Sequence, residues 1–186
     1  MIDRKKLEQA AALIIEAIGE DAGREGLAET PRRFADMMAE RLEYADVSNE
    51  EIARRFGKVF AAPSDDLILE KDIDAFSFCE HHIALMYNMK IAVGYRPKGK
   101  IIGLSKIARI ADAVTKRLQV QERIGADIRE IMEMCLGTED IIVVIDAEHS
   151  CMTSRGIRKV GAKTRTVTGS GVFRQIEYRN EVMAML

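Results

Sequence analysis

Cysteine, histidine and proline are scarce in this chain of 186 residues, which has three of each. Three cysteines cannot all pair with one another, so the composition favours a reducing compartment over a disulfide-stabilised secreted protein. An excess of charge is also lacking. The formal net charge of -2 excludes a general attraction to nucleic acid or anionic membranes, so any anion must be bound locally.

Long apolar runs are absent as well. No segment approaches the roughly 20 apolar residues that a membrane-spanning helix needs. The first 21 residues do not have the uninterrupted apolar core of a signal peptide, because Glu8, Gln9 and Glu16 break it. We therefore expect a cytoplasmic protein with no membrane partner and no nucleic-acid partner.

The composition that is present, 47% hydrophobic and 31% charged, is typical of a compact globular protein. Residues 3–18 predict an amphipathic helix with Leu7, Ala11, Ile14 and Ile18 on one face. Thr30 and Pro31 predict the N-cap and first turn of a second helix, in which Phe34, Met38 and Leu42 share a face. A third short helix is expected at 49–56. Residues 1–62 are thus predicted to form a helical N-terminal region.

From about residue 67 the hydrophobic pattern changes to the period of two that is typical of strands. Helical periodicity returns in the middle of this part. The expected elements are strands at 67–79, 87–95, 141–147 and 163–173, helices at 104–118 and 120–136, and a short C-terminal helix. This order predicts an α+β domain over residues 63–186, with an antiparallel sheet and a pair of antiparallel helices on one face.

All three histidines and two of the three cysteines lie in two short segments, Cys79-Glu80-His81-His82 and His149-Ser150-Cys151. Thiolate and imidazole ligands together favour zinc over cations that prefer oxygen. A Cys-x-x-His pair and one further cysteine would give three protein ligands and an open fourth position, as in reactive zinc sites. A closed, structural site that uses His81 or His149 as the fourth ligand is the alternative. Each segment follows a predicted strand, so neighbouring strands would bring the two together.

Two polar groups on the predicted helices are weaker signals. Gln121 and Glu122 open the second long helix, and Ser105, Lys106 and Arg109 begin the first. Ser105 suits an N-cap position, where free backbone N–H groups can bind an anion. Both groups are equally typical of ordinary solvent-exposed helix starts.

Taken together, four motifs resemble the GTP cyclohydrolase I family. They are Phe78–His82, Gly103–Ile110, Arg117–Arg123, and His149–Met152 followed by Arg155-Gly156. They occur in family order and with family-like spacing between about residues 70 and 175. Four motifs in register are far more specific than any one of them.

The resemblance implies the tunnelling fold and the hydrolytic opening of the guanine imidazole ring of GTP. The products are 7,8-dihydroneopterin triphosphate and formate, in the first step of tetrahydrofolate and pteridine synthesis. It implies Zn²⁺ on Cys79, His82 and Cys151, which lowers the pKa of a water toward ~7. His81 and His149 would carry protons, although the sequence does not say which histidine protonates which atom.

Substrate contacts follow from the same resemblance. Gln121 and Glu122 would hold the guanine edge, with the Glu122 carboxylate accepting two parallel N–H bonds. Triphosphate contacts would come from Ser105, Lys106, Arg109 and Arg155. The family assembles as a homodecamer with active sites between subunits, so the resemblance also implies homo-oligomerisation.

The segment Ile83–Asn88 departs from the family pattern, because it has neither the proline nor the glycine that most relatives carry there. Other functions are less consistent with the residues. A zinc deaminase would need an H-x-E…P-C-x-x-C signature, which is missing. A non-hydrolytic purine- or pterin-binding relative, with a structural zinc or with Cys79 as a thiol nucleophile, would leave Cys151 or the two spare histidines without a role. Cys135 is expected to pack in the core.

Overall fold

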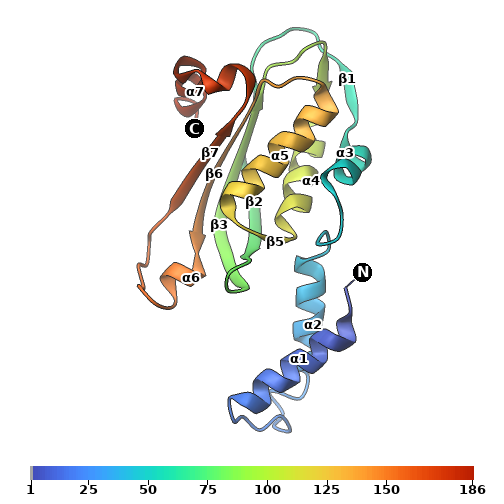
Figure 1. Ribbon diagram of the computed structural model, residues 1–186, viewed down its shortest axis with the longest axis vertical. Coiled ribbons are helices and arrows are strands. Elements are labelled where there is room, and N and C mark those ends of the chain that lie inside the picture. The colour runs from blue at the N-terminus through green and yellow to red at the C-terminus, as the bar shows by residue number, and fades with distance from the viewer. Residues whose placement is uncertain (1) are drawn as a thin grey trace. The chain divides into compact units, whose positions relative to one another are not determined.

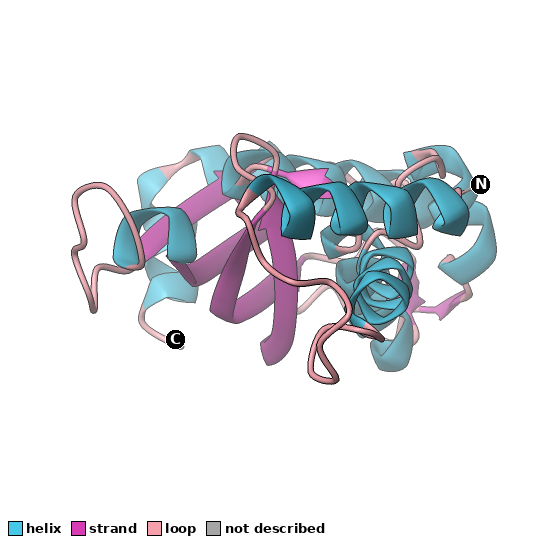
Figure 2. Ribbon diagram, turned by 90° about the horizontal axis from the view of Figure 1, so that it is seen from below, coloured by secondary structure: helices cyan, strands magenta, loops and turns pink. Residues whose placement is uncertain are grey.

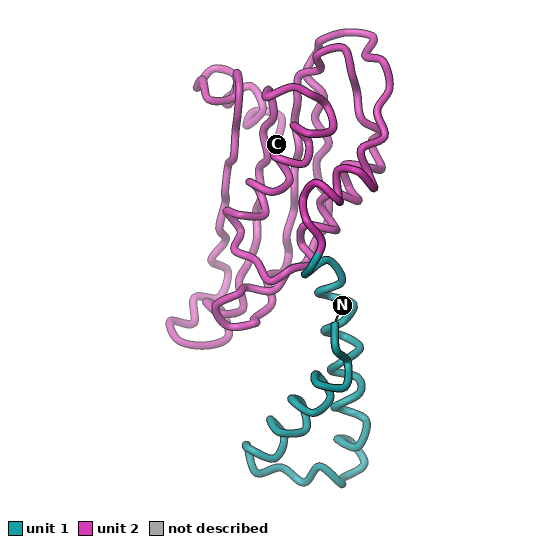
Figure 3. The backbone as a smooth tube through the Cα atoms, turned by 45° about the vertical axis from the view of Figure 1, so that its right-hand side comes forward, with its two compact units in different colours: residues 1–46 teal, residues 47–186 magenta. Residues whose placement is uncertain are grey.

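The computed structural model describes residues 2–186 (Figure 1). The chain divides into two compact units, residues 1–46 and 47–186 (Figure 3). The first unit contains α1 (Arg4–Ala17) and α2 (Thr30–Arg41). In chain order, the second contains α3 (Asn49–Phe56), β1 (Val59–Ala61), β2 (Ile68–Cys79), β3 (Ala84–Tyr95), β4 (Lys100–Ile102), α4 (Leu104–Thr115), β5 (Leu118–Gln119), α5 (Gln121–Leu136), β6 (Ile141–His149), α6 (Ser150–Thr153), β7 (Thr164–Gly169), the 3₁₀ helix η1 (Gly171–Arg174) and α7 (Ile176–Met183).

The unit boundary falls earlier than the expected division after residue 62. Helix α3 packs on α4 and α5, and β1 pairs with β4. These contacts place both elements in the second unit.

The helices of the first unit lie close to their predicted positions, but their buried faces match the prediction only at Ala11 and Met38. In α1 the buried residues are Ala11 and Ile15, while Ile14 and Ile18 are 55% and 68% exposed. In α2 they are Ala35, Met38 and Ala39. Small alanines at the contact let two helices approach closely, so the packing selects the Ala11–Ile15 stripe over the one that hydrophobicity alone suggested.

The main sheet of the second unit has five strands in the order β5-β2-β3-β6-β7. The pairs β2–β3, β3–β6 and β6–β7 are antiparallel, as predicted. The unpredicted two-residue strand β5 joins β2 in parallel, so the sheet is mixed rather than wholly antiparallel. Figure 2 shows these strands fanning out with the usual twist.

Helices α4 and α5 cover one face of this sheet, which confirms the predicted helical pair (Figure 1). Their inward residues include Ile107, Val114, Ile124 and Ile128, all fully buried. Gly125 allows α5 to lie close against β7, because a Cβ atom there would be 2.7 Å from the Thr168 Oγ1 atom. The start of α5 thereby lies against the middle of β6 and the start of β7.

The opposite face carries a second apolar cluster formed with η1 and α7. Its buried members are Ala92, Ile142, Val144, Phe173 and Val182. Alternation along β3 and β6 explains the two cores, since successive residues of a strand face opposite sides.

Several predicted boundaries are wrong by a few residues. Glu29 and Gly103 are the N-caps of α2 and α4, so Thr30 lies within α2 and Ser105 is the second residue of α4. Helix α4 ends at Thr115 instead of 118, and β7 ends at Gly169 instead of 173. The short elements β1, β4, β5, α6 and η1 were not predicted, because two to four residues carry too little periodicity. Among residues 2–186, no helix combines the length and apolarity needed to cross a bilayer.

Candidate metal site and adjoining pocket

The first metal-ligand segment is the turn between β2 and β3. Cys79 ends β2 and pairs with Ala84, the first residue of β3, so residues 80–83 form the turn. Ile83 has a φ of 48°, an unusual left-handed conformation for a β-branched residue. The turn therefore passes through a strained isoleucine beside the candidate ligands.

The second segment continues β6. His149 is the last residue of β6, and Cys151 lies in the single turn α6 that follows. Met86 of β3 pairs with His149. The ends of β2 and β6 therefore both lie beside β3, and only this one strand separates them. The expectation that strand ends bring the two segments together is confirmed.

Ligand atoms of Cys79, His82 and Cys151 all lie within 4.8 Å of one another. Tetrahedral zinc with sulfur ligands at about 2.3 Å would separate two sulfurs by about 3.8 Å, so a small inward movement completes the site. His81 and His149 are outside this group among the described residues. The donor set fits a zinc ion with three protein ligands.

The thiols are arranged to favour a cation. Cys79, Cys135 and Cys151 are all free. Burial, and then the neighbouring Cys79, raise the pKa of Cys151. Two thiols this close resist ionising together, and a divalent cation between them removes that resistance.

The two remaining histidines flank the ligands. The His81 Nδ1 atom is 3.6 Å from the Cys79 sulfur. The His149 Nε2 atom is 2.8 Å from the Gln121 Oε1 atom. Burial lowers the pKa of His149, against an opposing effect of the Glu122 carboxylate. Both residues line the same pocket as Cys79 and Cys151.

A pocket of about 210 Å³ opens beside the ligands. It is lined by residues of both metal-ligand segments, the start of α5 and the start of β7, namely Cys79, His81, Met86, Val120, Gln121, Glu122, His149, Cys151, Met152 and Thr164. Glu122 is exposed in the first turn of α5. The pocket thus combines soft metal ligands, two histidines and one carboxylate.

Comparison with known proteins identifies this arrangement. The family model described as GTP cyclohydrolase I matches residues 7–186. The chain belongs to the GTP cyclohydrolase I family. A protein of Ruminiclostridium cellulolyticum named GTP cyclohydrolase 1 is 54% identical over 179 residues, covering 93% of this chain and 92% of that protein. A Clostridium acetobutylicum protein of the same name is 52% identical over 178 residues, covering 93% and 91%.

Among solved structures, the crystal structure of the archaeosine synthase QueF-Like in the apo form aligns with a TM-score of 0.46 and 16% identity. The alignment covers 59% of this chain and 96% of that chain. This likeness is too weak to define the fold of a GTP cyclohydrolase I chain.

The predicted phosphate contacts lie in two places in this GTP cyclohydrolase I chain. Ser105, Lys106 and Arg109 lie in the first half of α4 and do not line the pocket. Helix α4 has 12 residues and is about 18 Å long, and β5, next to Cys79, follows its far end. Arg155 comes from the loop after α6, and its Nη1 atom is 2.6 Å from the His82 Nε2 atom. Only Arg155 of the four reaches the metal-ligand segments within one chain.

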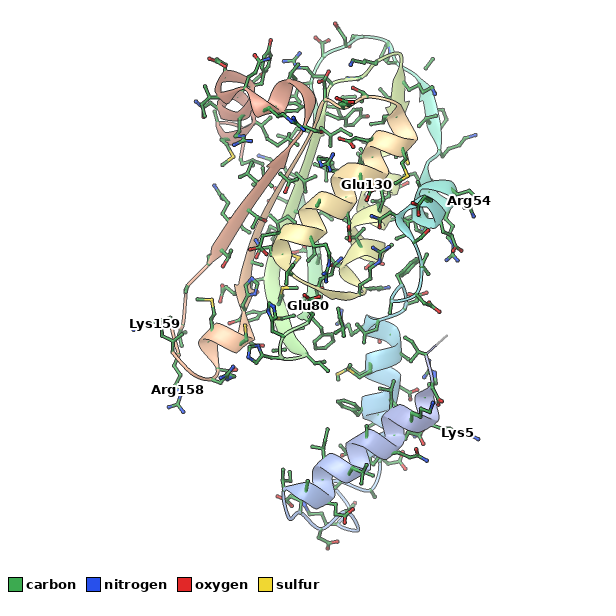
Figure 4. All side chains as sticks on the ribbon, viewed as in Figure 1. Lys5, Arg54, Glu80, Glu130, Arg158 and Lys159 are labelled. Atoms are coloured by element: carbon green, nitrogen blue, oxygen red, sulfur yellow. The ribbon has the colours of Figure 1, made fainter. Side chains whose placement is uncertain are left out.

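Figure 4 labels two further cations of this loop, Arg158 and Lys159, and both side chains are exposed. It also labels Glu80, in the turn that carries the ligands.

Sequence reasoning missed a polar network that ties this turn to α5. The Gln119 amide, 1% exposed, donates to Asp127 at 3.0 Å and accepts from the Arg123 Nε atom at 2.7 Å. Arg123 in turn forms an ion pair with Glu80, and Arg117 one with Asp127. The motif Arg117–Arg123 contained Arg117, Gln119 and Arg123, but only Gln121 and Glu122 in it had an expected role.

Proposed function

We propose that this chain hydrolyses GTP to 7,8-dihydroneopterin triphosphate and formate, the first step of tetrahydrofolate and pteridine synthesis. The observation that carries the proposal is the convergence of Cys79, His82 and Cys151 beside a pocket lined by Glu122, His81 and His149. A member of the GTP cyclohydrolase I family needs these groups together to open the guanine ring.

Cys79, His82 and Cys151 would hold zinc. When bound, zinc supplies a Lewis acid that makes water nucleophilic near neutral pH. The ligand set requires reduced thiols, which favours a reducing, cytoplasmic location.

The chain's own residues then perform recognition and proton transfer. The Glu122 carboxylate would accept the N1–H and N2–H bonds of guanine, which adenine does not offer in that pattern. His81 and His149, on either side of the ligands, would carry protons to and from the purine as water adds at C8 and the ring opens. Gln121 stands beside Glu122 at the same helix start and lines the same pocket.

Triphosphate binding would need more than one copy of the chain. Arg155 is next to the ligands, whereas Ser105, Lys106 and Arg109 lie in the first half of α4, whose far end leads to β5. We propose that these three residues serve the pocket of a neighbouring subunit in a homodecamer of tunnelling-fold subunits. Strand β7 at one edge of the sheet has one partner within the chain, and pairing with another copy would satisfy its second side.

The test is turnover of GTP by zinc-loaded protein, followed by formate release and by pterin fluorescence. The matched variant is His149→Ala, which leaves the three ligands intact and should retain zinc. We expect loss of ring opening by ~10²-fold or more, the usual range for a proton-transfer residue. Wild-type protein that binds GTP and zinc but releases no formate would refute the proposed activity and favour a binding role.

A further inference from the structure

The side chain of Gln121 is a buried amide with a fixed orientation. It is 1% exposed, and its Nε2 atom donates to the backbone carbonyls of Ile145 and Thr164, both at 2.9 Å. The hydroxyl of Thr166 lies 3.3 Å from the same nitrogen. A backbone carbonyl can only accept a hydrogen bond. Turning the amide over would set its oxygen against two carbonyl oxygens, so the orientation is determined by the fold.

This orientation leaves the Oε1 atom of Gln121 facing the Nε2 atom of His149 at 2.8 Å. An amide oxygen only accepts, so the Nε2 atom of His149 must carry the hydrogen. A neutral imidazole has one ring hydrogen, and the Nδ1 atom of His149 is therefore bare. The assignment follows from the heavy atoms and does not depend on where hydrogens were placed.

We propose that Gln121 is a positioning residue that selects the Nε2–H tautomer of His149 and thereby leaves the Nδ1 atom as the hydrogen-bond acceptor of the ring. The Nδ1 lone pair can then accept a hydrogen bond from an O–H or N–H group of the reacting purine or its water, while Gln121 keeps its bond to the Nε2 hydrogen. The tautomer itself does not depend on the proposed function, but its use in proton transfer does.

The position of Gln121 explains why the selection would persist during turnover. Gln121 is the first residue of α5, which Gly125 holds close to β7. Ile145 and Thr164 belong to the paired strands β6 and β7. The amide is therefore anchored in the sheet rather than in a mobile loop. Its two N–H groups are used by the protein, so the side chain has no hydrogen left to donate to a substrate.

The direct test is the ring state of His149 in the wild-type, zinc-loaded protein without GTP. Labelling histidine with ¹³C and ¹⁵N gives signals from only three rings, and solid-state NMR separates the two tautomers by their ring shifts. The signal lost in His149→Asn assigns the residue. We expect a single Nε2–H form. A Nδ1–H form, or a mixture, would overturn the proposal.

The variant Gln121→Met tests the causal role, because methionine fills a similar volume without the acceptor oxygen. We expect a mixed His149 tautomer and a kcat lower by ~10²-fold, with the KM for GTP and the zinc content unchanged. The matched control is Gln175→Met, which makes the same substitution at an exposed glutamine in the N-cap position of α7. It should leave the His149 tautomer as in the wild type.

A His149 ring that stays in the Nε2–H form in Gln121→Met would contradict the causal role. If this variant does not fold, the wild-type spectrum still decides the tautomer. Failure of formate release in the wild type would refute the proposed activity while leaving the tautomer assignment standing, so the two failures are distinguishable.

Discussion

Cys79 lies directly opposite Gln119 in the parallel pairing of β2 with β5, and the backbone N–H of Glu80 donates to the Gln119 carbonyl at 3.0 Å. The Gln119 side chain bonds to Val114, Arg123 and Asp127. One buried glutamine thus holds a metal-ligand segment by its backbone and the helix behind it by its side chain. Groups that orient metal ligands in this way often influence metal affinity strongly.

The variant Gln119→Met should therefore bind zinc more weakly. Residue 119, which pairs with Cys79, would lose the side-chain hydrogen bonds that anchor it, and Arg123 and Asp127 would lose the partner that they share. We expect zinc affinity to fall by ~10-fold or more, measured by competition with a chromogenic chelator. Gln9→Met, on the exposed side of α1, should have wild-type affinity. Equal affinities in the wild type and Gln119→Met would show that the network does not support the site.

Cys151→Ser should lose zinc and ring-opening activity together. The serine hydroxyl is neither soft nor ionised at neutral pH, so the site would have two good ligands left. Elemental analysis of the purified protein measures the metal, and formate release measures the activity. Cys135→Ala, which removes the thiol outside the ligand group, should keep a full complement of zinc. Wild-type turnover by a zinc-free Cys151→Ser protein would defeat the metal assignment.

Glu122→Gln should reduce discrimination between GTP and ATP. A neutral amide can accept from only one of the two guanine N–H groups and turns its own NH₂ group toward the other. The loss of a charge-assisted bond of about 1.5–3 kcal/mol would lower kcat/KM for GTP by ~10–10²-fold. Competition of ATP against GTP binding measures the selectivity. The control Glu177→Gln removes a carboxylate from the first turn of α7 and should leave the selectivity for GTP over ATP unchanged. An unchanged selectivity in Glu122→Gln would rule out the guanine contact.

Cys135 should make the folded protein less stable at high pH. Burial raises the pKa of this thiol from 9.0 to about 11, so the folded state holds the proton more tightly than the unfolded chain. The resulting stabilisation is fully present below pH 9.0 and is lost as the pH rises through about 11. Urea unfolding at pH 8 and at pH 10.5 measures it. The decline should be smaller in Cys135→Ala than in the wild type, and equal declines would contradict the burial effect.

Much of the second unit could be predicted from the sequence. The buried faces of α4 and α5 follow from isoleucines and valines at helical spacing. Strand β3 shows period two, and β6 begins with a continuous apolar run that is typical of a buried strand. The approximate positions of α1 and α2 were also predicted, but of their buried residues only Ala11 and Met38 were. Ile14 and Ile18 satisfy helical periodicity as well as Ile15 does, and only the contact between the two helices distinguishes them.

The residues of the candidate site also divide into those that the sequence revealed and those that it did not. Cys79, His82 and Cys151 were found because thiols and imidazoles are scarce in this chain, and their clustering needs no knowledge of the fold. Gln119 and Gln121 carry no comparable signal. A glutamine at the start of a helix is ordinary, and its role depends on which atoms surround its amide.

By itself, the sequence determined the ligand types, the family motifs and the alternation of apolar residues, because these depend on residue identity and local spacing. Only the tertiary structure decided that Gln119 pairs with Cys79 and that Gln121 faces His149. Both relationships join residues 28 or more positions apart. The first depends on how β5 pairs with β2 and the second on how α5 packs against β6 and β7, and no local pattern records either.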